Sequence, residues 1–376
     1  MRILLTCGGT AGHINPAIAV AQRLRELSPD CEILFIGAEG KMEMDLVPRD
    51  GFRILPLKVT NLSRGHHLED IGHNLNSLKN VIESGREAKR ILKEFRPDAV
   101  LGTGGYVCYP VLHEAAKLHI PTLIHESNAT PGLTTKMLAG QVSCVMLGYQ
   151  ESAGHYSGTA DLRVTGTPVR GRFSLYTREK AREELGIPAD LPLVVSMWGS
   201  LGSGHMNDIV MKMLPLMNGQ QDFCMIHATG SYYHDAVTEK LKAAGIVPAA
   251  CRTELREYIF DSERVLSAAD LVLCRAGAST LSELSSIGKP ALIVPSPNVT
   301  NHHQEKNARL VENAGGARVL LEGEFDEKSF LEEIRTLLRD AEGLERMAKA
   351  MRALSVPNAL DRIVDAVLEY AGKNRS

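Results

Sequence analysis

The chain has 376 residues, of which 44% are hydrophobic and 23% charged, and its formal net charge is −3. This composition is typical of a soluble globular protein with room for two cores, and the charge argues against a nucleic-acid binder that works by bulk charge. The seven cysteines form no Cys-x-x-Cys pair, so we expect reduced core thiols. With no signal-peptide core and no bilayer-spanning apolar run, we expect a cytosolic protein that can still touch a membrane surface.

Short apolar runs rich in Val, Ile and Leu alternate with helical patterns along the chain. A first series of expected strands lies at 2–7, 31–36, 98–103, 121–125 and 143–147. A second series lies at 193–198, 223–228, 271–274 and 291–295, with amphipathic helices expected at 15–27, 204–217, 232–243 and 301–314. Continuous apolar strands that alternate with helices predict parallel sheets covered on both faces, so the fold class is α/β.

The first strand leads into the glycine-rich stretch TCGGTAGHINPA, residues 6–17. Its glycines and hydroxyl suggest a phosphate site, but Cys7 occupies a position where a dinucleotide fingerprint needs glycine, and no P-loop Gly-Lys-Ser/Thr occurs. The second series opens in a similar way, with GSLGSGHMND at 199–208 between a strand and a helix. Two such turns predict two similar domains facing one cleft, with ligands beyond the carboxyl ends of the strands.

A third glycine-containing turn follows the strand at 271–274. Gly277 permits the turn, and Ser279 and Thr280 stand at the start of the next expected helix. Glu283, one turn further on, could accept both hydroxyls of a ribose. The letters TLSE are also a capping box with Thr280 as N-cap, and the sequence does not decide between these interpretations. Gln304 and Asn307, at the start of the following helix, could hold sugar hydroxyls or cap that helix.

We expect neither a metal nor a cofactor. HEAAK at 113–117 and HESNA at 125–129 lack the second histidine of a zinc motif, and no Asp-x-Asp pair is present to hold a divalent ion against a diphosphate. If a nucleotide diphosphate is the leaving group, helix dipoles and an arginine must stabilise its charge.

Six motifs resemble the MurG family of bacterial N-acetylglucosaminyltransferases, in that family's order from residue 1 to about residue 370. They are GGTAGHINPA (8–17), GTGGYVCYP (102–110), HESNATPGLTTKMLA (125–139), GTPVR (166–170), CRAGASTLSE (274–283) and PSPNVTNHHQEKNA (295–308). The resemblance implies a GT-B fold, with two Rossmann-like parallel-sheet domains facing a central cleft. It places the acceptor and membrane-side domain at 1–163, joined by a C-terminal helix at about 358–376, and the UDP-sugar domain at 164–357.

The resemblance also implies an activity. It is the inverting transfer of N-acetylglucosamine from UDP-N-acetylglucosamine to the 4-hydroxyl of the muramyl residue in undecaprenyl-diphospho-N-acetylmuramyl-pentapeptide, which converts lipid I to lipid II in peptidoglycan synthesis. Two alternatives stay open: a UDP-N-acetylglucosamine 2-epimerase, and another GT-B lipid glycosyltransferase such as one acting on diacylglycerol. A nicotinamide oxidoreductase is disfavoured because neither glycine turn has the required spacing.

The acceptor lipid implies a peripheral protein on the cytoplasmic face of the bacterial cell membrane. Residues 68–95 predict a helix with apolar residues at heptad-like spacing, most of which we expect in the core. A neighbouring basic stripe would, with part of that apolar face, dock on anionic lipid. The stripe consists of Lys79, Arg86, Arg90 and Lys93, interrupted by Glu83.

The family's donor contacts carry over to matching positions of this chain. The resemblance places Thr10, Ala11, Gly12, Asn128, Arg170 and Ser200 at the sugar diphosphate, and Ile259 at the uracil. It places Ala278, Ser279, Thr280, Leu281, Ser282 and Glu283 at the nucleotide-binding helix start, with Glu283 on the ribose, and Gln304 at the N-acetylglucosamine hydroxyls. Gly104, Gly105 and Tyr106 would lie on the acceptor side. Arg170 and the N–H groups of the glycine turns would stabilise the departing diphosphate.

The base that takes the acceptor proton has two candidates. His13 is our first candidate, because an imidazole titrates near working pH, although it could instead bind substrate or cap the helix. Glu126 is the alternative, although it could instead orient Asn128. The chain departs from the family pattern at Trp198 and Leu201, in a turn that usually reads Gly-Gly-Ser followed by a polar or basic residue. It also has Ser127 where the family has glutamine.

Overall fold

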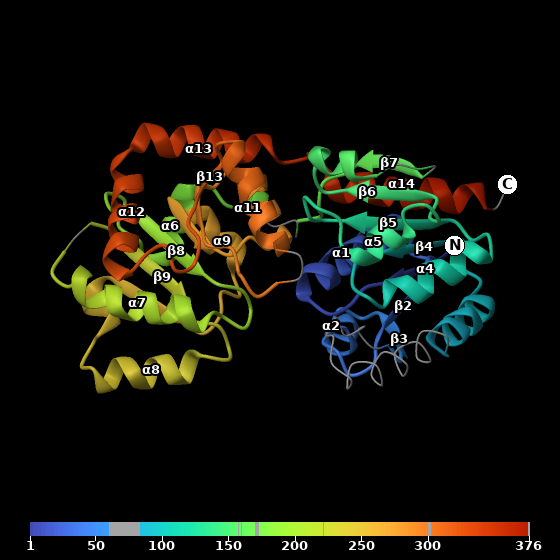
Figure 1. The fold of residues 1–376 in the computed structure, drawn as a ribbon, viewed down its shortest axis with the longest axis horizontal. Coiled ribbons are helices and arrows are strands. Elements are labelled where there is room, and N and C mark those ends of the chain that lie inside the picture. Colours follow the sequence, from blue (N-terminus) through green and yellow to red (C-terminus); the bar gives the residue numbers. More distant parts are fainter. Residues whose placement is uncertain are drawn as a thin grey trace. The chain divides into compact units, whose positions relative to one another are not determined.

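The computed structural model of the chain describes residues 1–59, 83–156, 158, 160–169, 173–220, 222–299 and 302–374. It divides into two compact units, unit 1 (Met1–Val169 with Val356–Ser376) and unit 2 (Arg170–Ser355), shown in Figure 1. Residues 164–169, which we expected in the second domain, lie in unit 1. The backbone N–H groups of Thr165 and Gly166 both donate to the carbonyl oxygen of Leu147 at 3.0 Å, which fastens this segment to the first sheet.

The sheet of unit 1 has seven parallel strands in the order β3-β2-β1-β4-β5-β6-β7. The strands are β1 (Arg2–Thr6), β2 (Glu32–Ala38), β3 (Arg53–Leu57), β4 (Ala99–Gly102), β5 (Thr122–Glu126), β6 (Cys144–Leu147) and β7 (Asp161–Val164). The central strands confirm the prediction. Strands β3 and β7 lie outside the predicted runs because both are edge strands, are only partly buried, and lack a continuous apolar run.

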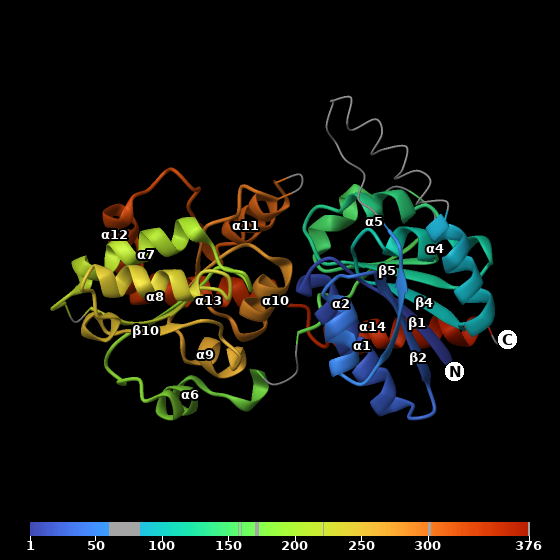
Figure 2. The same cartoon turned by 90° about the horizontal axis from the view of Figure 1, so that it is seen from below.

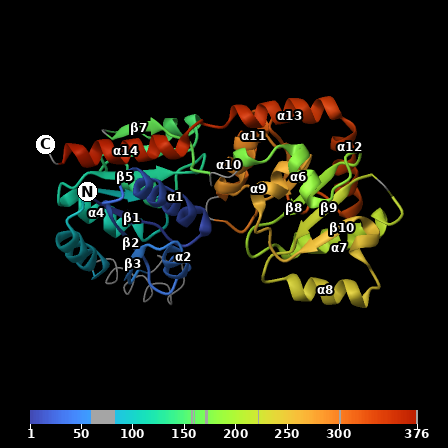
Figure 3. The same ribbon diagram turned by 180° about the vertical axis from the view of Figure 1, so that it is seen from behind.

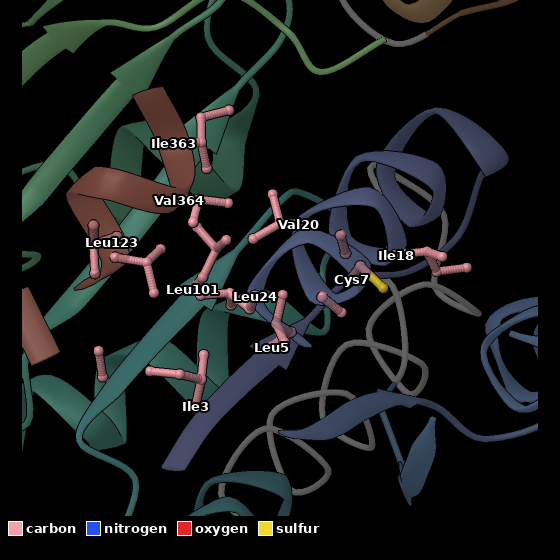
Figure 4. Packing of buried hydrophobic residues seen from close by; sticks show 14 of the residues in the cluster. Ile3, Leu5, Cys7, Ile18, Val20, Leu24, Leu101, Leu123, Ile363 and Val364 are labelled. Atoms are coloured by element: carbon pink, nitrogen blue, oxygen red, sulfur yellow. The ribbon is translucent and has the colours of Figure 1, made fainter. Parts of the chain in front are cut away.

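Helices cover both faces of this sheet (Figure 2). One face carries α1 (Ala11–Leu27) and the C-terminal helix α14 (Ala359–Lys373), which pack side by side, as Figure 3 shows. In the core on that face, Ile3 and Leu5 of β1 lie with Leu24 of α1 and Val364 of α14 (Figure 4). Leu4 points to the opposite face, because successive strand side chains alternate.

The opposite face of the sheet of unit 1 is covered by a helix at residues 83–95 together with α4 and α5. Helix α4 spans Cys108–Lys117, α5 spans Leu133–Leu138, and the short α2 (Glu43–Arg49) follows β2. A 3-10 turn, η1 (Gln150–His155), precedes β7. Both faces of the sheet are therefore covered, as the continuous apolar strands predict.

Unit 2 has a second parallel sheet with the strand order β10-β9-β8-β11-β12-β13. Its strands are β8 (Leu193–Met197), β9 (Cys224–Ala228), β10 (Thr253–Arg256), β11 (Leu271–Cys274), β12 (Ala291–Ile293) and β13 (Ala317–Val319). The sequence again predicts the four central strands and misses β10 and β13, which are the edges.

The helices of unit 2 also lie on both faces of its sheet, with α7, α8 and α12 on one face and α6 and α9 on the other (Figure 2). The helices are α6 (Arg178–Leu185), α7 (Gly204–Met217), α8 (His234–Ala243), α9 (Ser262–Ala268), α10 (Ala278–Ile287), α11 (His303–Asn313), α12 (Glu327–Arg339) and α13 (Ala341–Ala353). Two 3-10 turns, η2 (Phe173–Leu175) and η3 (Pro248–Cys251), complete the unit.

Both sheets reverse their strand order at one place. In unit 1 the chain builds outward from β1 to β3 and then returns to the other side of β1 with β4; in unit 2 the same reversal falls between β8 and β11. In open parallel sheets ligands bind beyond the carboxyl ends of the strands at such a reversal. No helix in the described part of the chain combines the length and apolar character needed to cross a bilayer.

Candidate functional site

The first glycine turn lies at the strand-order reversal of unit 1, between β1 and α1. Gly9 has φ +87°, a left-handed conformation that favours glycine. Helix α1 begins at Ala11, earlier than the expected residue 15, because Gly12 and His13 lie inside the helix and not in the loop. Thr10 is the N-cap, with an extended backbone and no side-chain hydrogen bond to the helix. The predicted His13 therefore lies in the first helical turn, at the positive end of the helix dipole.

A further glycine turn, which follows β4 and contains Gly104 and Gly105, contacts the first glycine turn. The Gly8 N–H donates to the Gly104 carbonyl oxygen at 3.1 Å, and a Cβ atom added at Gly105 would overlap with the Gly8 carbonyl oxygen. A Cβ atom at Gly104 would overlap with the imidazole of His13. The Thr103 hydroxyl donates to the His13 carbonyl oxygen at 2.7 Å. The structure thus brings together His13 and the predicted acceptor-side residues, and only glycine leaves room for the ring.

Glu43, a buried carboxylate behind the first turn, is not among the predicted site residues. It is fully buried, and accepts hydrogen bonds from the N–H groups of Ala38 at 2.9 Å and Gly9 at 3.2 Å. Burial, and to a lesser extent the charge of Glu43, raise the pKa of the predicted Tyr106. An acidic residue in the first turn of a helix is ordinary, so the sequence offers no signal that marks Glu43.

These contacts show which N–H groups of the first glycine turn are already engaged within the protein. We expected the N–H groups of the glycine turns to stabilise the charge of the departing diphosphate. In unit 1, however, the Gly8 N–H donates to Gly104 and the Gly9 N–H donates to Glu43. The N–H groups of Gly8 and Gly9 are therefore engaged within the protein, whereas those of Thr10 and the first turn of α1 follow at the positive end of the helix dipole.

Glu126, at the end of β5, holds the turn that follows it. Its Oε1 accepts from the N–H and side-chain amide of Asn128 at 3.0 and 2.9 Å. Its Oε2 accepts from the Gly132 N–H at 2.8 Å and the Thr135 hydroxyl at 2.7 Å. The carboxylate is buried, and so is the adjacent Ser127, the residue that departs from the family pattern. This geometry favours the interpretation that Glu126 orients Asn128 over its use as a base.

His125 is a further buried residue of this edge that the sequence analysis did not single out. Its Nε2 donates to the Gly166 carbonyl oxygen at 2.8 Å, and burial lowers its pKa, so the ring is neutral. It joins β5 to the segment 164–169, which leads to the predicted Arg170. Arg170 itself lies outside the described residues.

In unit 2 the turn after β8, Gly199–Gly202, stands at the second strand-order reversal. Gly199 and Gly202 have φ +91° and +81°, and the predicted Ser200 is exposed. Ser203 caps α7, its hydroxyl accepting from the Met206 N–H at 3.4 Å. Arg275, which follows β11, donates to the Ser203 hydroxyl at 2.7 Å, so the ends of β8 and β11 are joined.

The start of α10 resolves the ambiguity of the third turn. The helix begins at Ala278 with Gly277 as N-cap, so the capping-box interpretation with Thr280 as N-cap is wrong. Leu281 is buried in the core, and the Ser282 hydroxyl donates back to the Ala278 carbonyl oxygen at 2.9 Å. At this helix end the side chains of Ser279, Thr280 and Glu283 are half-buried.

The remaining predicted residues of unit 2 contribute in different ways. Ile259 is 5% exposed, so its side chain packs in the core, whereas the neighbouring Phe260 is 84% exposed. The Gln304 Oε1 accepts from the Ser296 N–H at 2.9 Å. Asn307 is buried and donates to the Ala276 carbonyl oxygen at 3.1 Å, which ties α11 to the turn before α10. Asn307 therefore has a structural role.

Two further features concern ions and lipid. Within the residues that the structure describes, no group of three His, Cys, Asp or Glu side chains is placed to hold a metal ion. Most of the predicted helix at 68–95, including Lys79, lies outside the described residues. In its described part Leu92 is buried, and Arg90 pairs with Glu87 at 2.6 Å and Glu94 at 2.7 Å, which offsets one charge of the basic stripe.

Comparisons with known proteins agree over the whole chain. The glycosyltransferase family 28 N-terminal domain matches residues 3–147, and the family 28 C-terminal domain matches residues 193–363. The chain is 41% identical over 376 residues to the UDP-N-acetylglucosamine–N-acetylmuramyl-(pentapeptide) pyrophosphoryl-undecaprenol N-acetylglucosamine transferase of Acetivibrio thermocellus, with 100% of both chains covered. It is 38% identical to the transferase of the same name from Caldanaerobacter subterraneus, covering 98% of this chain and 99% of that one. The crystal structure of Acinetobacter baumannii MurG superposes with a TM-score of 0.79 at 27% identity, covering 98% and 99%.

Proposed function

The chain belongs to glycosyltransferase family 28, and from this membership we propose that it transfers N-acetylglucosamine from UDP-N-acetylglucosamine to the 4-hydroxyl of an undecaprenyl-linked muramyl-pentapeptide. The observation that carries the proposal is the 41% sequence identity, over the full length of both chains, to the N-acetylglucosamine transferase of Acetivibrio thermocellus. The resemblance found in the motifs and the GT-B fold are thereby confirmed. A 2-epimerase is the weaker alternative, because the full-length relatives carry transferase names.

In this proposal unit 2 binds the donor. The N-terminus of α10 directs its positive dipole end and the hydroxyls of Ser279 and Thr280 at the diphosphate. Glu283 accepts hydrogen bonds from the ribose hydroxyls. Since the Ile259 side chain is in the core, the uracil meets the backbone at that position. The Oε1 of Gln304 is already engaged by Ser296, so its Nε2 group is the part that donates to a sugar hydroxyl.

Unit 1 supplies the base. His13 takes the proton of the muramyl 4-hydroxyl, whose oxygen then attacks the anomeric carbon in line and forms the new glycosidic bond. The bond from that carbon to the diphosphate breaks, and UDP leaves with the electron pair. Helix N-termini, and Arg170 by the family resemblance, stabilise the charge that grows on the diphosphate. The overlap that a Cβ at Gly104 would make with the imidazole supports a fixed position for this ring.

We also propose that the protein acts at the cytoplasmic face of an anionic membrane, because its acceptor is a lipid. Arg86, Lys89 and Lys93 are exposed on the helix at 83–95 and support this orientation. Co-sedimentation with anionic vesicles at low salt is expected, with release at high salt. The double variant Arg86→Glu/Lys93→Glu should bind less. Equal binding by both proteins, or none by the wild type, would contradict this part of the proposal.

The central experiment measures UDP release from UDP-N-acetylglucosamine with and without the muramyl lipid. We expect release that depends on this lipid, together with a disaccharide product. Isomerisation of the donor without any acceptor would indicate the epimerase. Transfer to diacylglycerol in preference to the muramyl lipid would indicate the other lipid glycosyltransferase.

A further inference from the structure

We propose that a buried chain of hydrogen bonds, from the indole of Trp198 to the carbonyl of Thr229, positions the glycine turn 199–202 to receive the donor diphosphate. The identity of the ligand rests on the proposed function; the chain of hydrogen bonds does not. Trp198, where this chain of hydrogen bonds begins, is one of the two residues of this turn that depart from the family pattern.

The buried chain consists of four hydrogen bonds. The Trp198 Nε1 lies 2.9 Å from the Ser196 hydroxyl oxygen, which lies 2.9 Å from the His227 Nδ1. The His227 Nε2 lies 3.0 Å from the Asn207 Oδ1, and the Asn207 Nδ2 lies 2.9 Å from the Thr229 carbonyl oxygen. Each of the five residues is at most 2% exposed. Ser196 and His227 are direct neighbours across the β8–β9 pair, so the sheet register sets the central link.

The direction of every link is determined by chemistry. An indole N–H only donates and a backbone carbonyl only accepts, so both ends of the chain are fixed. The Ser196 hydroxyl accepts from Trp198 and donates to the His227 Nδ1. That ring therefore carries its proton on Nε2 and donates it to Asn207, whose amide group donates to Thr229. Burial lowers the pKa of His227 to about 3, so this neutral tautomer persists across the working pH range.

The last acceptor lies directly against the glycine turn. A Cβ atom added at Gly202 would overlap with the Thr229 carbonyl oxygen, and one at Gly230 would overlap with the Gly202 backbone. The Ser231 N–H donates to the Ser200 carbonyl oxygen at 3.3 Å. The turn after β8 thus rests on the segment 229–231 after β9. Asn207 holds the Thr229 carbonyl in place. Because the turn that carries Ser200 packs against this carbonyl, Asn207 also sets the position of the turn relative to the sheet.

Trp198, the first residue of the hydrogen-bond chain, also lies against this turn. The guanidinium of Arg275 stacks over the Trp198 ring, with its Cζ 5.7 Å from the ring centroid, and donates to the Ser203 hydroxyl at 2.7 Å. Trp198 therefore supports the turn at its C-terminal side through Arg275 and Ser203. The indole of Trp198 thus contacts both the hydrogen-bond chain and Arg275. A substitution at Trp198 or Ser196 should therefore change the position of Ser200.

Ser196, His227 and Asn207 of the hydrogen-bond chain are not a nucleophilic triad. Ser196 and His227 are inside neighbouring strands, with 0% and 1% of their surface exposed, so no substrate carbonyl can reach the hydroxyl. They are positioning residues, and their test must report on the ligand and not only on stability.

Trp198 is the single tryptophan of the chain, so its fluorescence reports on this site alone. We expect a blue-shifted emission in the wild type, and a change in intensity on addition of UDP with the same Kd that calorimetry gives. In Ser196→Ala the indole N–H and the His227 ring lose their partner. Its affinity for UDP should fall about 5- to 10-fold, the loss expected for one internal hydrogen bond at a binding turn.

The matched control is Thr253→Val, which removes another buried hydroxyl of unit 2. Thr253 donates to the Cys251 carbonyl oxygen at 3.1 Å at the start of β10, at the opposite end of its strand from the ligand edge. It should lose stability but bind UDP like the wild type. If Ser196→Ala does not fold, Trp198→Phe carries the same comparison, since it keeps an aromatic ring near Arg275 and removes the indole N–H together with the rest of the second ring.

The outcomes are distinct. Weaker UDP binding in Ser196→Ala, with normal binding in Thr253→Val, supports the proposal. Unchanged UDP affinity in Ser196→Ala, or a UDP titration that leaves Trp198 fluorescence constant while calorimetry detects binding, overturns it and leaves the proposed function standing. A wild type that binds no UDP overturns the proposed function itself.

Discussion

Glu43 accepts a hydrogen bond from the backbone N–H of Gly9 at 3.2 Å, 34 residues earlier in the chain, and one from Ala38 at 2.9 Å on its other oxygen. A carboxylate accepts on both arms, whereas an amide has one accepting oxygen. In Glu43→Gln one N–H group must therefore face the amide's own donors, and the turn before Thr10 should shift. We expect kcat to fall about 10-fold, or ~1.4 kcal/mol, with a smaller change in the KM for the donor.

A suitable control for Glu43 is Glu312→Gln in unit 2. Glu312 also ties a helix to a backbone N–H, accepting from Val319 at 2.9 Å, and its other donor is Arg309, so neither donor belongs to a glycine turn. This variant should keep its kcat. A Glu43→Gln enzyme whose kcat and donor KM both match the wild type would show that the buried carboxylate does not position the turn.

The contact between Gly104 and His13 yields a second prediction. Gly104 has φ +123°, and a Cβ there would overlap with the imidazole. In Gly104→Ala the ring must move, and a displacement of about 1 Å can cost about 10²-fold in rate. We expect steady-state turnover to fall by that order while calorimetric UDP affinity, which in the proposed function depends on unit 2, is retained. Gly140→Ala is the control because nothing lies within 4 Å of its added Cβ; equal turnover in the two variants would refute the argument.

The two candidate bases should behave differently on removal. His13→Gln should lower kcat by about 10²–10⁴-fold, as loss of a general base does, with UDP binding intact. Glu126→Gln should instead lower the melting temperature, because Oε1 and Oε2 each accept two hydrogen bonds and the amide can satisfy only one of these pairs. Steady-state kinetics and thermal unfolding of both variants make the comparison. Full turnover in His13→Gln with a large loss in Glu126→Gln would exchange the roles.

Glu283 should matter for the ligand and not for the helix cap. Since Gly277 is the N-cap of α10, Glu283→Ala removes no capping box. We expect UDP binding to weaken by about 1.5–3 kcal/mol, the loss of hydrogen bonds to a charged acceptor, with a near-normal melting temperature. Ser286→Ala, which removes a hydroxyl that donates to the Glu283 carbonyl oxygen at 2.7 Å, is the control on the same helix. Calorimetric titration that gives equal Kd values for Glu283→Ala and the wild type would exclude the ribose contact.

Lys289 provides a prediction about pH. Burial lowers its pKa to about 8, although its ammonium group donates to the carbonyl oxygens of Ser267 and Ala269 at 2.7 Å. Between about pH 8 and the unfolded value near 10.4 the unfolded chain binds the proton more readily, so stability rises with pH in this window. The gain should be about 2–3 kcal/mol by denaturant unfolding. Lys289→Met should lack this gain; a variant with the same pH dependence as the wild type would contradict the shift.

The sequence by itself determined the fold class, the central strands and the family. Runs such as 2–7 and 271–274 are apolar throughout because both faces of a parallel strand are covered, and that property is written locally in consecutive residues. The edge strands β3, β7, β10 and β13 escaped because they are less covered and carry no such run. The motifs with Thr10, Ser200 and Glu283 were visible for the same reason: each is a short local pattern of glycine and hydroxyl residues.

Only the tertiary structure decided what these motifs touch. The links from Glu43 to Gly9, from Gly104 to His13, and from Trp198 to Thr229 join residues far apart in the chain. They exist because the strand order places β2 and β4 on either side of β1, and β9 beside β8. Periodicity records how deeply a residue is buried but not which neighbour it meets. The partner of a buried polar group is set by strand order and register, and these are properties of the assembled sheet.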